Sequence, residues 1–137
     1  MDFVLDASVA IAWVLRDEVS IVSEALLEAF ETGNGYAPAI WPLEVANALL
    51  MAERGGRIPE GGATELLASL AQLEIDVEVV STIDHLDVEL ALAREHRLTI
   101  YDASYLALAM RLNAPLATLD QRLRAAARNA GVALLSD

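Results

Sequence analysis

Short apolar runs alternate with helical patterns along this chain, and this alternation limits the possible folds more than any other feature. Six runs favour buried strands: Phe3–Leu5, Tyr36–Pro38, Val77–Val80, Leu98–Ile100, Leu116–Thr118 and Val132–Leu135. Seven segments favour helices, at about Ser8–Arg16, Val19–Glu31, Pro42–Arg54, Ala63–Leu73, His85–His96, Ala103–Leu112 and Gln121–Ala130. Strands that alternate with helices predict a parallel sheet covered by helices on both faces. We therefore expect the α/β class, as a three-layer α/β/α sandwich with a mainly parallel central sheet.

The length and the even composition predict a single domain over residues 1–137. The 137 residues contain no internal repeat, low-complexity segment or long linker. They are 55% hydrophobic but only 5% aromatic, so the core should consist of Ala, Leu, Val and Ile.

Two residue types are missing, and each absence excludes a class of chemistry. The chain has no cysteine, which excludes disulfides, thiolate nucleophiles and cysteine-based metal sites. It also has no lysine, which excludes a P-loop lysine and a Schiff-base lysine.

The charge is strongly negative and unevenly spread. The net charge is −12, with three arginines against 17 acidic residues in residues 1–93. Residues 94–137 hold six arginines against four acidic residues. Such a chain should bind nucleic acid poorly without regard to sequence, so a phosphate-bearing substrate would need a metal and local arginines.

The N-terminus carries no recognisable targeting signal. The segment Met1–Asp6 is acidic where a signal peptide needs a basic start, and the apolar stretch Ala7–Leu15 is too short to span a bilayer. We expect a soluble, cytoplasmic protein with no membrane association.

Four acidic residues stand where predicted strands end or helices begin. Asp6, Asp102 and Asp120 each follow a predicted strand, and Glu44 lies just inside the helix that opens at Trp41–Pro42. Ligands of parallel α/β folds bind at the carboxyl ends of the strands. Carboxylates packed together repel one another unless a proton or a cation intervenes, so convergence predicts a hard divalent metal. A metal held in this way indicates phosphate chemistry.

Helix capping is the competing explanation for these acids. Asp is among the best N-cap residues, and Asp6, Asp102 and Asp120 each precede a predicted helix. Capping is the better explanation for any one of them alone. Three at successive junctions, together with Glu44 in a further helix, favour a shared site.

Polar neighbours of the acids are candidates for supporting roles. Glu44 and Asn47 form a polar strip on one helix, which is otherwise explained as a solvated edge. Ser8 lies two residues from Asp6, and Thr118 two residues from Asp120, so each hydroxyl could donate to a carboxylate or a metal-bound water. Capping by Ser8 and the strand propensity of Thr118 are the simpler explanations.

Four segments resemble the conserved segments of a known family. Val4–Ser8, Leu43–Asn47, Tyr101–Tyr105 and Ala117–Asp120 are similar in order and spacing to those of PIN domains. The resemblance spans the whole chain and is greatest to the small bacterial and archaeal members, the VapC toxins of type II toxin–antitoxin pairs.

This resemblance implies a metal-dependent endoribonuclease. Asp6, Glu44, Asp102 and Asp120 would hold one or two Mg²⁺ or Mn²⁺ ions, which activate a water for attack on phosphorus. It also implies an RNA substrate, a homodimer and a small VapB-like antitoxin whose basic arm covers the acidic site. Trp13, Val14 and the helix around Leu26–Phe30 are groove candidates for that arm, although a core role is the simpler explanation for each.

Other classes fit less well or remain open. A receiver domain requires a lysine, and a haloacid-dehalogenase-type enzyme requires a second acid two residues after its nucleophile, where this chain has Ser8. The alternatives that remain are an RNA-processing PIN nuclease outside any toxin pair and a non-catalytic PIN module that binds RNA or protein.

Overall fold

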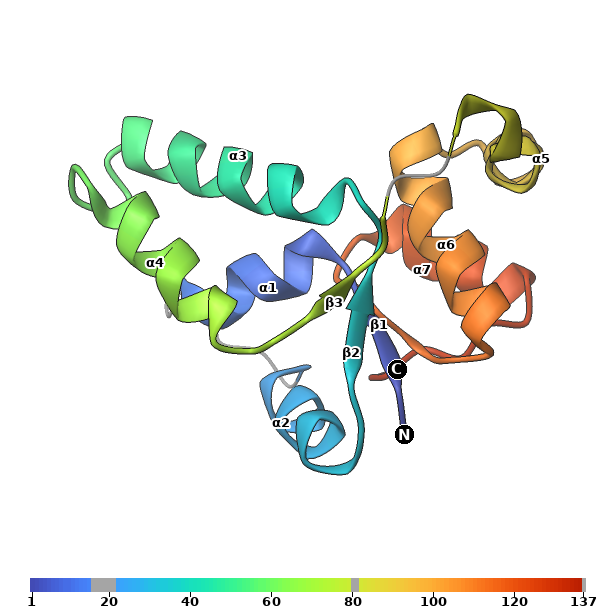
Figure 1. The fold of residues 1–137 in the computed structure, drawn as a ribbon, viewed down its shortest axis with the longest axis horizontal. Helices are drawn as coiled ribbons and strands as arrows, with labels where there is room; N and C mark the ends of the chain where they lie inside the picture. Colours follow the sequence, from blue (N-terminus) through green and yellow to red (C-terminus); the bar gives the residue numbers. More distant parts are fainter. Residues whose placement is uncertain (16–21, 80–81, 137) are drawn as a thin grey trace.

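The computed structural model describes residues 1–15, 22–79 and 82–136, and it is built around a parallel sheet (Figure 1). The strand order is β3-β2-β1-β4, with strands β1 (Phe3–Leu5), β2 (Gly35–Ala37), β3 (Asp76–Val77) and β4 (Leu116–Ala117). Val4 pairs with Tyr36 on one side and with Leu116 on the other, so β1 lies inside the sheet. The pairs β1–β2, β1–β4 and β2–β3 are all parallel, and the carboxyl ends of these strands therefore share one edge.

Helices cover both faces of this sheet. The helices are α1 (Ala7–Val14), α2 (Val22–Thr32), α3 (Trp41–Arg54), α4 (Gly62–Ala71), α5 (Asp87–His96), α6 (Ile100–Leu112) and α7 (Gln121–Asn129). In Figure 1, α1 to α4 lie on the left of the sheet and α5 to α7 on its right. The predicted three-layer α/β/α sandwich is confirmed.

The prediction of a strand at Leu98–Ile100 is wrong. Ile100 begins α6, and the side chain of Thr99 caps that helix by accepting a hydrogen bond from the backbone N–H of Asp102 at 3.1 Å. Helix α5 ends in a left-handed turn at Arg97, with φ 55°, which leaves only Leu98 between the two helices and their caps. Asp102 therefore lies in the first turn of α6 and does not follow a strand.

Other boundaries differ by a few residues. Of the predicted strand Val132–Leu135, the structure contains a single parallel bridge between Leu134 and Leu116. Strand β3 is shorter than the predicted Val77–Val80, and Val80 lies outside the described residues. The predicted ends of two helices, Arg16 and Val19, lie outside them as well.

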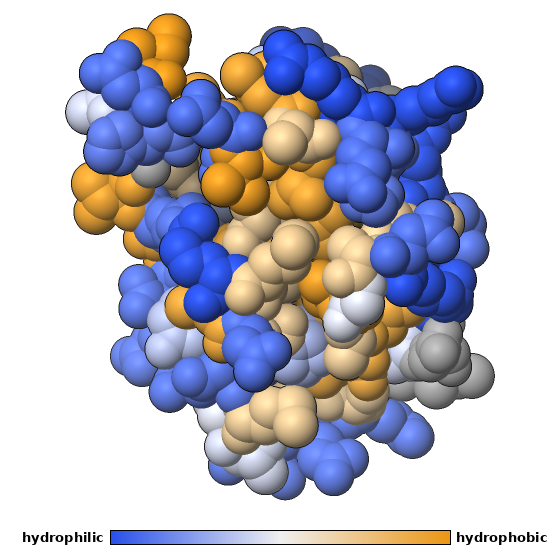
Figure 2. Space-filling model, turned by 90° about the vertical axis from the view of Figure 1, so that its right-hand side faces the viewer, coloured by the Kyte–Doolittle hydropathy of each residue, from blue (hydrophilic) through white to orange (hydrophobic). Residues whose placement is uncertain are grey.

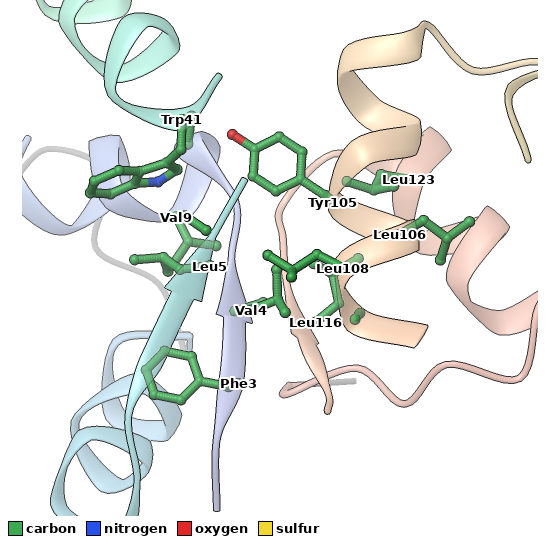
Figure 3. Packing of buried hydrophobic residues seen from close by; sticks show 14 of the residues in the cluster. Phe3, Val4, Leu5, Val9, Trp41, Tyr105, Leu106, Leu108, Leu116 and Leu123 are labelled. Atoms are coloured by element: carbon green, nitrogen blue, oxygen red, sulfur yellow. The ribbon is translucent and has the colours of Figure 1, made fainter. Parts of the chain in front are cut away.

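The core is centred on β1, whose three residues are fully buried. Figure 3 shows Phe3, Val4 and Leu5 between apolar side chains from both helical layers. The ring of Phe3 meets that of Phe30 edge-on, with centroids 5.0 Å apart, which attaches α2 to the sheet.

The candidates for an antitoxin groove mostly belong to this core. Leu26 and Ala29 are buried, and Trp13, Val14 and Phe30 are partly buried and pack against the core cluster. Leu27, which is 52% exposed, is the exception on α2. The simpler explanation from the sequence therefore applies to most of them.

The surface on the α5–α7 side mixes apolar and charged residues. Figure 2 shows this face, with apolar side chains in orange between hydrophilic ones in blue. Val88 and Leu90 on α5 and Met110 and Leu112 on α6 are exposed apolar residues. Among the described segments, none of the helices combines the length and the apolar character needed to cross a bilayer.

Candidate active site

The four acidic residues come from four elements around the carboxyl edge of the sheet. Asp6 joins β1 to α1, and Asp120 is the N-cap of α7, three residues beyond the end of the neighbouring strand β4. Glu44 lies in the first turn of α3, where Pro42 stands at the helix start, as predicted. Asp102 lies in the first turn of α6.

The carboxylate of Asp6 is buried and held by two hydroxyl groups. Asp6 is 6% exposed, and its Oδ2 accepts hydrogen bonds from Ser8 Oγ at 2.7 Å and from Thr118 Oγ1 at 2.6 Å. Although Asp6 occupies the N-cap position of α1, its side chain makes no capping hydrogen bond. The capping explanation is therefore wrong for Asp6.

The two hydroxyls are themselves fixed by the backbone of the β4–α7 junction. Ser8 Oγ accepts from the N–H of Leu119 at 3.0 Å, and Thr118 Oγ1 accepts from the N–H of Asp120 at 3.1 Å. A hydroxyl has one proton, so a hydroxyl that accepts from an amide directs that proton to its other partner. Both protons point to Asp6, and these two hydrogen bonds act to lower its pKa.

Asp120 caps its helix, whereas Asp102, like Asp6, does not. Oδ1 of Asp120 accepts from the N–H groups of Arg122 at 2.9 Å and Leu123 at 3.2 Å, so capping is correct for this residue. Helix α6 is capped by Thr99, which makes capping wrong for Asp102. A second carboxylate oxygen of Asp120 takes no part in these two capping bonds.

Glu44 is held from the opposite helical layer. Its Oε1 accepts a hydrogen bond of 2.6 Å from the hydroxyl of Tyr105 on α6. The sequence reasoning missed this role of Tyr105, although its position three residues after Asp102 places both on one side of a helix. Asn47, one turn further along α3 than Glu44, is exposed.

Burial and mutual repulsion raise the pKa of three of the carboxyl groups. Burial is the main cause for Asp6, Glu44 and Asp102. The charge of Asp120 raises the pKa of Asp6 and of Asp102, while the charges of Asp6 and Asp102 raise that of Glu44. Hydrogen bonds from Thr118 and Ser8 to Asp6 act in the opposite direction. The four acids thus lie within electrostatic reach of one another.

These acids do not form a ready-made coordination shell. Within residues 1–15, 22–79 and 82–136, no three acidic or histidine side chains are gathered tightly enough to hold one metal ion as they stand. The fold brings the four acids into one region, but their side chains remain apart, as expected for charges of the same sign.

An arginine accompanies the acids. Arg122, exposed in the first turn of α7, lowers the pKa of Asp102 through its charge. The sequence showed an excess of arginines in the last third of the chain but could not place any of them. Arg122 thus adds an exposed cation near Asp102.

Comparison with known proteins identifies the family of this chain. A sequence profile of the family described as "PIN domain" matches residues 3–129. Ribonuclease VapC3 of Pyrobaculum aerophilum is 33% identical over 123 residues, which are 90% of this chain and 92% of that protein. The matched region includes all four acidic residues of the site.

Solved structures share the fold. The crystal structure of PAE2754 from Pyrobaculum aerophilum has a TM-score of 0.69 and 26% identity, covering 92% of this chain and 87% of the other. The structure of VapBC-1 from nontypeable Haemophilus influenzae has a TM-score of 0.65 and 15% identity, covering 98% of this chain and 96% of the other. At that identity, the second likeness supports the fold alone.

Proposed function

Because this chain belongs to the PIN domain family, we propose that it is a metal-dependent endoribonuclease of the VapC type, the toxin of a toxin–antitoxin pair. The observation that carries the proposal is that Asp6, Glu44, Asp102 and Asp120 all stand at helix starts around the carboxyl edge of the sheet. Hydrogen bonds from Tyr105 to Glu44 and from Thr118 to Asp6 link these elements. A relative that is 33% identical across nearly the whole chain is itself a ribonuclease.

A hard divalent cation suits this set of donors. All four candidate ligands are carboxylates, the ligand type preferred by Mg²⁺ and Mn²⁺. Burial and neighbouring charges raise the pKa of three of these carboxyl groups. A bound cation would offset both the cost of burying the charged carboxylates and their mutual repulsion. The acidic side chains would have to draw together around the ion, because no three described residues form a ready shell.

The residues of this chain have separable tasks in phosphodiester hydrolysis. Bound Mg²⁺ or Mn²⁺ would supply an activated water and neutralise charge on the phosphate, with Asp6, Glu44, Asp102 and Asp120 as ligands. Hydrogen bonds from Ser8 and Thr118 orient the Asp6 carboxylate and act to lower its pKa against the effect of burial. Arg122 offers a guanidinium to a backbone phosphate of the RNA.

The partners follow from charge and from exposed apolar surface. An antitoxin with a basic arm would complement a chain of net charge −12. A homodimer is part of the same proposal, and exposed apolar residues on α5 and α6, among them Val88 and Met110, are candidates for its contacts. Asn47, which is exposed one turn beyond Glu44, would contact the substrate in this proposal.

Two alternative functions use the same fold. An RNA-processing nuclease outside a toxin pair would share the site, whereas a non-catalytic binding module would not need all four acids. The retention of every acid, together with the hydroxyl support of Asp6, favours the catalytic proposal.

Induced expression tests the toxin function directly. Expression of the wild-type chain should arrest growth, and Asp102→Ala should abolish the arrest because a ligand is lost. The purified wild-type chain should also melt at a higher temperature in millimolar Mn²⁺ than in a chelator, since a ligand that binds only the folded state stabilises it. Persistent arrest by Asp102→Ala at equal expression would contradict the proposal.

A further inference from the structure

The hydroxyl of Tyr105 is a buried polar group with a single side-chain partner, Glu44. Tyr105 is 0% exposed, and its hydroxyl donates to Oε1 of Glu44 at 2.6 Å. Figure 3 shows the ring reaching from α6 towards the start of α3, with its oxygen at the far end. A buried hydroxyl without a partner is costly, so this hydrogen bond fixes both side chains.

This hydrogen bond spans the two helical layers at the candidate site. Helix α3 belongs to the layer on the left of Figure 1 and α6 to the layer on the right. Glu44 comes from the first turn of α3, while Asp102 comes from the first turn of α6, one turn before Tyr105. The position of the Glu44 carboxylate relative to Asp102 therefore depends on this contact.

The phenol donates to Glu44, and its oxygen also has a hydrogen bond from the backbone N–H of Ala7. A hydroxyl has one proton, and at 2.6 Å this proton is directed to Oε1 of Glu44, which is therefore held as its acceptor. Oε2 is the oxygen left to meet another partner.

We propose that Tyr105 is a positioning residue, whose hydroxyl holds Oε1 of Glu44 so that Oε2 is presented to the divalent cation. The inference rests on the proposed function, because it assigns Glu44 as a metal ligand. A Glu side chain has several rotatable bonds, and a tether that removes this freedom before binding raises affinity. The ring of Tyr105 packs in the core, whereas its hydroxyl serves the site.

The test is Mn²⁺ binding by the full-length chain with Tyr105→Phe. Phe keeps the ring and removes only the hydroxyl. The dissociation constant for Mn²⁺, measured by the loss of the free-ion signal in electron paramagnetic resonance, should rise about 10–100-fold, as for other groups that orient a metal ligand. RNA cleavage should fall at limiting Mn²⁺ and recover at saturating Mn²⁺, with the KM for RNA unchanged. Tyr36→Phe, a change of the same kind in β2, should leave Mn²⁺ binding at the wild-type value.

A double variant separates positioning from a general loss of stability. If Tyr105 acts through Glu44, then Glu44→Gln with Tyr105→Phe should bind Mn²⁺ as weakly as Glu44→Gln alone. Additive losses, or a folded Tyr105→Phe variant with the wild-type dissociation constant, would overturn the role of Tyr105 and leave the proposed function standing. A wild-type chain that neither binds Mn²⁺ nor cleaves RNA would overturn both.

Discussion

Two strand-to-helix junctions, β1–α1 and β4–α7, have the same local design but place their aspartates differently. Asp6 and Asp120 each occupy the N-cap position of the helix, after neighbouring parallel strands. Asp6 makes no capping bond and accepts from two hydroxyls in a buried position. Asp120 caps α7 with two backbone hydrogen bonds and is only partly buried.

The difference arises from what the neighbouring junction supplies. The hydroxyl of Ser8, two residues after Asp6, accepts a hydrogen bond from the backbone N–H of Leu119. The hydroxyl of Thr118 donates a hydrogen bond to Asp6 on the neighbouring strand-to-helix junction. The β4–α7 junction thus supports the carboxylate of the β1–α1 junction, while its own carboxylate supports its helix. Whether an acid at a helix start caps the helix or belongs to a site therefore depends on its neighbours in space. The local sequence does not show these neighbours.

The largest effect should come from Asp6→Asn. The amide keeps the shape and a hydrogen-bond acceptor for Thr118 and Ser8 but removes a charged ligand, so the rate of RNA cleavage should fall about 10³-fold or more. Cleavage of a labelled structured RNA in Mn²⁺ measures this, and circular dichroism checks the fold. The matched control is Asp2→Asn, an exposed acid whose amide can still accept from Asn34, and it should cleave at the wild-type rate. Wild-type activity in Asp6→Asn would remove Asp6 from the site.

The sequence was sufficient to predict much of this comparison. Apolar runs before Asp6 and Asp120 placed both residues at strand ends, and Pro42 placed Glu44 in the first turn of a helix. Ser8 donates to Asp6, two residues away, as its spacing indicated. Thr118 also donates to a carboxylate, but to that of Asp6, 112 residues away, and not to that of its neighbour Asp120. Except for this last contact, the predicted features depend on residues close in sequence.

The features that the sequence did not predict depend on contacts between distant segments. The apolar run Leu98–Ile100 was taken for a strand, but Thr99 caps a helix there instead. Nothing local distinguishes Asp6 from Asp120 as a capping residue, because the distinction lies in the alignment of β1 with β4. Tyr105 was missed because its partner Glu44 is 61 residues away.

The second-largest effect should come from removing the hydrogen bond that Thr118, at the β4–α7 junction, donates to Asp6. Thr118→Val keeps the branched shape and removes the hydroxyl, so Asp6 loses a donor and the N–H of Asp120 loses an acceptor. Activity or metal affinity should fall about 10–100-fold, which is typical when a group that orients a ligand is removed. Titration with Mn²⁺ and cleavage assays measure the two losses. Thr64→Val on the exposed face of α4 is the control, and an equal loss there would show that the effect is not specific.

A third, smaller effect is a pH dependence of the free energy of unfolding that arises from Asp6 at the β1–α1 junction. The pKa of Asp6 is raised in the folded chain, so the folded state binds more protons than the unfolded state between the ordinary carboxyl range and the raised pKa. The free energy of unfolding of metal-free protein should therefore fall as pH rises through this window and level off above it. Urea denaturation from about pH 4 to about pH 8 measures the slope. Asp6→Asn should flatten it, and so should saturating Mn²⁺; a slope unchanged by Asp6→Asn would contradict the assignment.

The smallest effect should distinguish a capping acid from a buried one by stability alone. Asp120→Ala removes the acceptor for the N–H groups of Arg122 and Leu123, so the free energy of unfolding should fall by about 1 kcal/mol. Asp120→Asn should leave it nearly unchanged, because Asn caps helices as well as Asp does. Asp6→Asn should instead raise the stability of the metal-free protein at neutral pH, because it removes a buried charge that has no cation. If Asp6→Asn and Asp120→Asn changed stability equally, the two junctions would not differ in the way that their hydrogen bonds indicate.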